Sequence, residues 1–129
     1  MWSPRGDGMA EPRVRAIRGA TTAEANTASA ILEATRDLVV ALQGANGFQP
    51  EDVVAAIFTA TPDLDAAFPA TAERDVGWLV PLLDAVEMDV PGAPRMCVRA
   101  LVQIYTTSGP ERLHHVYLRG AARLRPDLS

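Results

Sequence analysis

The chain has a single cysteine, Cys97, among its 129 residues. One cysteine excludes an internal disulfide and any metal site built from several thiolates. The neighbouring residues Met96 and Val98 are apolar, and an apolar setting raises the pKa of a thiol and makes it unreactive. We therefore expect Cys97 to be a buried structural thiol rather than a nucleophile.

Lysine is absent, and all twelve basic residues are arginines. The formal net charge of −4 argues against nucleic acid as a partner. Arginine binds carboxylates through two parallel hydrogen bonds, so an all-arginine inventory suits small anionic ligands. Genome composition is the simpler explanation for the missing lysine, and the bias by itself assigns no ligand.

Apolar runs long enough to cross a membrane are also missing. Residues 1–12 (MWSPRGDGMAEP) are rich in proline, glycine and charge, and they lack the apolar centre of a signal peptide. We expect these residues to form a flexible N-terminal tail ahead of a single domain at 13–129. The same features predict a cytoplasmic protein with no membrane partner.

Hydrophobic patterning predicts both strands and a helix. Apolar alternation or continuous apolar runs predict five strands, at 13–19, 53–60, 79–83, 98–106 and 113–118. Helical spacing predicts one long helix, which starts in the capping-box pattern Thr21–Glu24 and ends near Gln43, before Gly44. Shorter helical turns are expected at 50–52, 70–77 and 120–124.

The predicted fold class is therefore α+β, with a mixed β-sheet of about five strands and one long helix. One helix cannot cover both faces of a sheet of this size. We therefore expect an oligomer that buries the remaining sheet surface.

Motifs for the commonest chemistries are missing: there is no phosphate-binding glycine loop, no zinc-ligand spacing and no nucleophile elbow. His114 and His115 are adjacent, so on a strand they point to opposite faces and form no ligand pair. The acidic residues that follow the second and third strands match no calcium loop; they are Asp63, Asp65, Asp84, Glu87 and Asp89. We expect no metal site.

Charged side chains instead gather at the ends of predicted elements. Arg99 opens the fourth strand and Glu87 follows the third. Arg18 shares a strand face with Val14, which we take as the core side, where arginine is unusual. Converging arginines suit a small polycarboxylate, but strand-end arginines also form structural salt bridges, and the residues alone leave both interpretations open. The candidate residues for such a ligand site are Arg18, Arg74, Arg99, Arg125, Glu87 and Tyr117.

Six blocks, spread from Arg13 to Ser129, have the order and spacing of a known family. They are IRGATT at 17–22, ATPDL at 60–64, AFPA at 67–70, EMDV at 87–90, HVYL at 115–118 and LRPDLS at 124–129. They resemble the monofunctional chorismate mutases of the AroH class, and the strand content excludes the all-helical chorismate mutases.

This resemblance implies a homotrimer that forms a pseudo-α/β-barrel, with active sites between neighbouring subunits. It implies the Claisen rearrangement of chorismate to prephenate in phenylalanine and tyrosine biosynthesis, without metal or organic cofactor. The reaction is unimolecular, and it therefore needs conformer selection and electrostatic stabilisation rather than a nucleophile.

The resemblance also assigns roles to residues. Arg99 would donate to the breaking ether oxygen, and Glu87 would accept from the substrate hydroxyl. Arg18 would hold a carboxylate, and Tyr117 would add a hydroxyl contact; these four are the expected catalytic residues. The remaining substrate-binding residues would be Phe68, Ala70 and Arg74 of the adjacent subunit, together with Leu83, Asp84, Leu124 and Arg125. With substrate between them, Glu87 and Arg99 are expected to be held apart by the Pro/Gly-rich loop rather than joined as a salt bridge.

Three positions depart from the family pattern. Leu83 stands where threonine is common, Asp84 where cysteine is common, and Thr71 where a lysine lies near the site. Asp84 would add a second carboxylate near Glu87, or would itself accept from the substrate hydroxyl. The main rival function is a non-catalytic trimeric module that binds small carboxylates. A trimeric deaminase of enamines and imines is a second rival, against which the EMDV and RPDL blocks argue.

Overall fold

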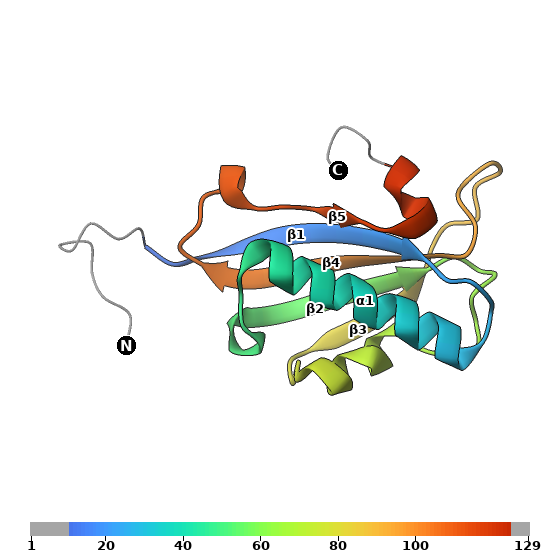
Figure 1. The fold of residues 1–129 in the computed structure, drawn as a ribbon, viewed down its shortest axis with the longest axis horizontal. Coiled ribbons are helices and arrows are strands. Elements are labelled where there is room, and N and C mark those ends of the chain that lie inside the picture. The colour runs from blue at the N-terminus through green and yellow to red at the C-terminus, as the bar shows by residue number, and fades with distance from the viewer. Residues whose placement is uncertain (1–10, 125–129) are drawn as a thin grey trace.

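The computed structural model describes residues 11–124, and Figure 1 shows a single sheet crossed by one long helix. The strands are β1 (Arg13–Thr22), β2 (Val53–Ala60), β3 (Leu82–Val86), β4 (Cys97–Thr106) and β5 (Val116–Tyr117). The helix is α1 (Ala28–Asn46). Short 3₁₀ segments are η2 (Pro50–Asp52), η3 (Pro69–Val76), η4 (Pro110–Arg112) and η5 (Arg119–Arg123).

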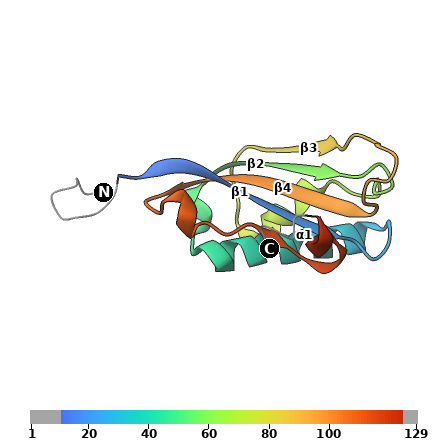
Figure 2. The same cartoon turned by 90° about the horizontal axis from the view of Figure 1, so that it is seen from above.

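The sheet is mixed, with strand order β3-β2-β4-β1-β5. The central strand β4 is antiparallel to both β1 and β2, whereas β3 is parallel to β2 and β5 is parallel to β1. Seen from above, α1 lies on one side of the sheet and leaves the opposite side open (Figure 2). The predicted α+β fold, with five strands and one long helix, is confirmed.

The core lies between α1 and the covered face of the sheet. Leu38 and Leu42 of α1 are fully buried, as are Phe58 of β2 and Val102 of β4. Burying one such side chain contributes about 1.5–3 kcal/mol. Gly19 lets the helix approach β1 closely, because a Cβ there would lie 2.8 Å from Leu38 Cδ1 and 3.0 Å from Leu42 Cδ1.

The helix starts later than the capping-box pattern predicts. β1 continues to Thr22, which pairs with Cys97 of β4, so Thr21–Glu24 does not start the helix. The N-cap is Thr27, whose side chain accepts from Ala30 N at 3.1 Å. The helix also passes the predicted stop at Gly44 and ends at Asn46, and it is followed by the C-cap Gly47, whose φ of 68° is left-handed. Strand pairing outweighs the local capping signal at the first end.

Two predicted strands are misplaced. β3 begins at Leu82 rather than at Leu79, which is 88% exposed and precedes the start of pairing with β2. β5 contains only Val116 and Tyr117. The residues before it dock on the end of α1 instead, because His114 N donates to Asn46 Oδ1 at 2.7 Å and His114 O accepts from Asn46 Nδ2 at 2.9 Å.

The open face of the sheet carries exposed apolar side chains together with charged ones. Ile57, Leu83 and Leu101 are 41%, 66% and 38% exposed. The strand face of Val14 and Arg18 is this open face, because Ile17 points to the covered side and is fully buried. The placement of Arg18 on the core side was therefore wrong: the arginine stands on the uncovered face, where its charge is easily solvated.

Candidate active site

Strand register brings the candidate residues into two neighbouring rows on the open face. Thr59 of β2 pairs with Arg99 of β4, Arg99 with Ala20 of β1, and Ala20 with Tyr117 of β5. The adjacent row aligns Leu83, Ile57, Leu101 and Arg18. Residues two apart on a strand share a face, so Arg18, Arg99 and Tyr117 converge although the sequence separates them widely.

These rows border a hollow of about 350 Å³ in the open face. Arg18, Arg99 and Tyr117 line it, together with apolar Ile57 and Leu101. Two guanidinium groups in a partly apolar recess form a site for a small anion, because each can hold a carboxylate or a partly charged oxygen by two hydrogen bonds.

Glu87 joins this site from the end of β3. Its backbone N donates to Ala60 O at 2.9 Å, which extends the pairing of β2 and β3 by one residue. Its Oε2 accepts from Thr59 Oγ1 at 2.6 Å and lies 3.1 Å from Arg99 Nε. The Glu87 side chain is 15% exposed and that of Arg99 42%.

The expectation that the Pro/Gly-rich loop holds Glu87 and Arg99 apart rather than joining them as a salt bridge was therefore wrong. The two residues form an ion pair, although Nε is not aligned for a hydrogen bond. The physical reason is that the ends of β3 and β4 flank β2, which puts a carboxylate and a guanidinium within reach of each other. A guanidinium has five N–H donors, so pairing through Nε leaves Arg99 able to engage a second acceptor.

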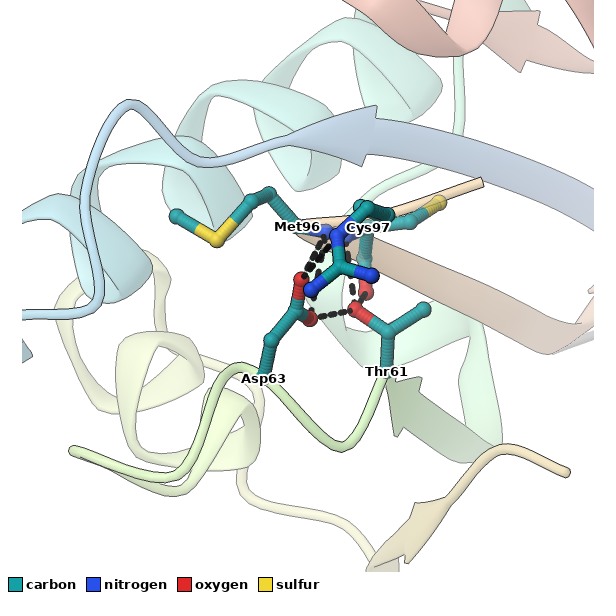
Figure 3. A network of polar contacts seen from close by, with 5 residues as sticks. Thr61, Asp63, Met96 and Cys97 are labelled. Atoms are coloured by element: carbon teal, nitrogen blue, oxygen red, sulfur yellow. Dashed lines mark hydrogen bonds and ion pairs between the residues drawn. The ribbon is translucent and has the colours of Figure 1, made fainter. Parts of the chain in front are cut away.

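A rigid corner fixes the start of β4, two residues before Arg99 (Figure 3). Asp63 accepts from Met96 N at 2.9 and 3.2 Å, through its two carboxylate oxygens. Thr61 accepts from Cys97 N at 2.9 Å and donates to Asp63. These bonds hold Met96 in a left-handed conformation with φ of 55°, which is unfavourable for a residue with a side chain.

The pKa values of two residues at this corner, Asp63 and Cys97, are shifted. Burial alone would raise the pKa of Asp63, but hydrogen bonds from Thr61 and Met96 N and the charge of Arg95 lower it below its usual value. Burial raises the pKa of Cys97 to about 11. Cys97 is fully buried, which confirms the prediction of a structural thiol. Arg95 Nε lies 3.8 Å from Asp63 Oδ2.

Arg18 is held through its backbone. Its N donates to His115 Nδ1 at 2.9 Å, which ties the segment before β5 to β1 beside the hollow. Tyr117 is half-buried and packs with Leu124 against Ala20 and Cys97. Leu124 is the last described residue, and Arg125 lies outside the described residues.

The other expected binding residues are not in this hollow. Asp84 sits in register with Phe58, on the covered face, and its Oδ1 accepts from Ala70 N at 2.9 Å. The structure therefore places its carboxylate away from the open face that carries Arg99. Leu83 is on the open face beside Ile57.

The segment leading into η3 borders a separate hollow. Phe68, Pro69 and Asp84 line this second hollow of about 400 Å³, and Phe68 is 72% exposed. Arg74, further along η3, is also exposed. The site residues thus fall into two groups on one subunit, with Arg18, Glu87, Arg99 and Tyr117 in the first.

Sequence reasoning missed Thr59, Thr61 and Asp63. Thr59 is the polar residue near the end of an apolar strand, and its place one residue before the strand end could have indicated a site role. Thr61 and Asp63 were noted only within the ATPDL block, and Asp63 as an acidic residue that fits no calcium loop; their role was missed because their partners Met96 and Cys97 lie more than thirty residues away.

Metal and membrane features can be addressed only for residues 11–124. In that range no group of three or more His, Cys, Asp or Glu side chains is arranged to hold a metal ion. None of the helices in the same range combines the length and apolar character of a membrane span.

Fold and site together define a class: an α+β protein in which two arginines converge on a hollow in the open face of its sheet. A model of the family "Chorismate mutase type I" matches residues 14–128. The chain belongs to this family.

Named relatives agree with this assignment. "Chorismate mutase AroH" of Thermus thermophilus is 50% identical over 117 residues, which cover 89% of this chain and 96% of that protein. The Bacillus subtilis protein of the same name is 44% identical, over 90% of this chain and 93% of its own length. A solved structure titled "Chorismate mutase from Clostridium thermocellum Cth-682" superposes with a TM-score of 0.81 at 44% identity, covering 83% of this chain and 96% of that one.

Proposed function

We propose that the chain catalyses the rearrangement of chorismate to prephenate, as a cytoplasmic enzyme of phenylalanine and tyrosine biosynthesis that needs no cofactor. The carrying observation is the hollow in which Arg18 and Arg99 converge with Tyr117, next to Glu87. Membership of the type I family and the names of its relatives support the same reaction.

The proposed mechanism relies on electrostatics. As the ether C–O bond lengthens, negative charge grows on oxygen, and the Arg99 guanidinium stabilises it. Glu87 accepts from the substrate hydroxyl and faces the ring, where positive character develops. Thr59 holds this carboxylate in place through its 2.6 Å hydrogen bond. Arg18 holds a substrate carboxylate, and Tyr117 adds a hydroxyl contact.

Substrate changes the role of the Glu87–Arg99 ion pair. The pair keeps both side chains ordered before binding, at a separation of 3.1 Å. Arg99 turns its Nη donors to the ether oxygen when chorismate binds. Such preorganisation lowers the reorganisation needed in the transition state.

The complete site requires a second subunit. Phe68 and Arg74 are exposed and lie outside the hollow of Arg99. The open face around that hollow presents apolar Ile57, Leu83 and Leu101, a surface typical of subunit contacts. We place Phe68, Ala70 and Arg74 of one subunit against the hollow of its neighbour in a homotrimer, with Leu124 and Arg125 closing over the ligand.

The decisive test follows chorismate absorbance after addition of purified protein. The unmodified chain should convert chorismate, and Arg99→Ala should lower turnover by ~10²–10³-fold, the scale for one preorganised oxyanion donor. Arg112→Ala is the matched control, because Arg112 is an exposed arginine of η4 outside the hollow. Its turnover should be unchanged.

Two outcomes would contradict the proposal. Near-normal turnover of the Arg99→Ala variant would remove Arg99 from the mechanism. Binding of chorismate to the unmodified chain without any conversion would favour the alternative, a trimeric module that only binds small carboxylates.

A further inference from the structure

A fully buried carboxyl group lies under η3. Glu73 is 0% exposed, and neither of its side-chain oxygens has a hydrogen-bond partner among the described residues. An ionised carboxylate in such a place costs several kcal/mol unless it is paired. Nothing in the proposed reaction uses Glu73, so its presence in the core needs a separate explanation.

The charges around Glu73 are mostly negative. On β3, Asp84 is near enough to act on it electrostatically, and Asp75 does so from η3 itself. Strand β2 contributes no titratable group. Helix α1 contributes Arg36, but Arg36 Nη2 is paired with Asp75 Oδ2 at 2.8 Å. Burial first, then the charges of Asp84 and Asp75, raise the pKa of Glu73 to about 8, and the backbone N–H of Glu73 itself, which makes no hydrogen bond to the carboxyl group, lowers the pKa in part.

Asp84 contacts the beginning of the same segment. Its Oδ1 accepts from Ala70 N at 2.9 Å, near the start of η3. Burial raises the pKa of Asp84, and the bond from Ala70 N lowers it in part. Asp84 therefore holds the first turn of η3 on β3, while Glu73 is buried one turn further along.

We propose that Glu73 and Asp84 are positioning residues, two interacting carboxyl groups, one fully buried and one half-buried, that together carry one proton and thereby fix η3 against β3. Removing the proton would leave an unpaired negative charge on the fully buried Glu73, and the charge of the half-buried Asp84 would repel it. The segment that would shift carries Ala70 and Arg74 and follows Phe68. The effect on catalysis rests on the proposed function, in which these residues line the neighbouring subunit's site.

The raised pKa of Glu73 makes the folded chain less stable as the pH rises. The pKa of Glu73 is raised in the folded chain from 4.5 to about 8. The unfolded chain therefore loses this proton at lower pH than the folded chain does. The stabilisation from neutral Glu73 is complete below 4.5 and is lost as pH rises to about 8.

The first experiment measures the melting temperature of the unmodified chain and of Glu73→Gln across this pH range. The amide introduced by this substitution cannot ionise and has nearly the same shape as the carboxyl group. The melting temperature of the unmodified chain should fall by about 5 °C or more relative to Glu73→Gln between acid and mildly alkaline pH. Glu51→Gln, in the exposed acidic turn η2, is the control and should keep the pH profile of the unmodified chain. If the melting temperatures of the unmodified chain and of Glu73→Gln change in parallel with pH, the proposal of a proton-carrying carboxyl pair is overturned.

The second experiment measures KM and kcat for chorismate in the same variants. Above the pKa of Glu73, KM of the unmodified chain should rise by about tenfold with little change in kcat, as expected when a binding wall is displaced. In Glu73→Gln, KM should stay flat. If the melting curves diverge but KM stays flat in both proteins, η3 is not positioned by the pair. If they diverge and neither protein converts chorismate, the proposed function fails while the carboxyl pair stands.

Discussion

The two faces of the sheet differ in burial and in charge. The covered face, under α1 and η3, is built from fully buried residues such as Phe58 and Val102. The open face alternates with it along the same strands, and there Arg99 keeps 42% of its side chain exposed beside Glu87. A charged side chain loses little solvation free energy where it stays in contact with solvent or a ligand. The charged candidate site therefore lies on the open face.

The comparison also separates two kinds of acid. On the open face, Glu87 has Thr59 and Arg99 as partners. On the covered side, Glu73 has no partner for either oxygen among the described residues, and the pKa values of both Glu73 and Asp84 are raised. Burial is the main cause of both shifts, and in Asp84 the hydrogen bond from Ala70 N offsets part of it.

The largest expected effect tests this contrast through two neighbouring residues of β2. Phe58→Ala should lower the free energy of unfolding by about 3–5 kcal/mol, because it opens a cavity in the core. Ile57→Ala, one residue away on the open face, should cost much less at protein concentrations where the subunit is isolated. Urea unfolding measures both. Equal losses at every concentration would mean that the open face is covered within one subunit.

The alternation of side chains between the two faces could be predicted from the sequence. Which of the two faces α1 covers could not. The alternation in Arg13–Gly19 is visible, yet Arg18 was assigned to the wrong face. The strand does not say which side α1 will cover, and Val14 and Ile17 are equally apolar. The structure shows the covered face at Gly19, where a Cβ would lie 2.8 Å from Leu38 Cδ1 of α1.

The site shows the same division between local and distant information. The family resemblance assigned roles to Arg18, Glu87, Arg99 and Tyr117, and the structure brings all four together. Cross-strand register could not be derived from the blocks, because pairing of Thr59 with Arg99 spans forty residues of chain. The ion pair and the hydrogen bond of Asp84 to Ala70 depend on that register, and they escaped prediction for this reason.

The next effect in size compares an acid from each side of the sheet. Glu87→Ala should lower kcat/KM for chorismate by roughly 10²-fold, because it removes a carboxylate that acts in the transition state. Asp84→Ala should lower it less, and chiefly through KM, because Asp84 holds η3 rather than facing Arg99. Steady-state kinetics at neutral pH measure both. The reverse ranking would move the contact with the substrate hydroxyl to Asp84.

The smallest expected effect concerns Thr59, which sequence patterns did not single out. Thr59→Val keeps the shape of the side chain and removes the 2.6 Å hydrogen bond to Glu87 Oε2. A hydrogen bond to a charged group contributes about 1.5–3 kcal/mol, but Arg99 remains to hold the carboxylate at 3.1 Å. We therefore expect kcat to fall by only about tenfold, toward the weak end of that range. Thr59→Ser should restore it, because serine supplies the same donor. Loss in both variants would show that packing by the threonine methyl, rather than its hydroxyl, holds Glu87 in place.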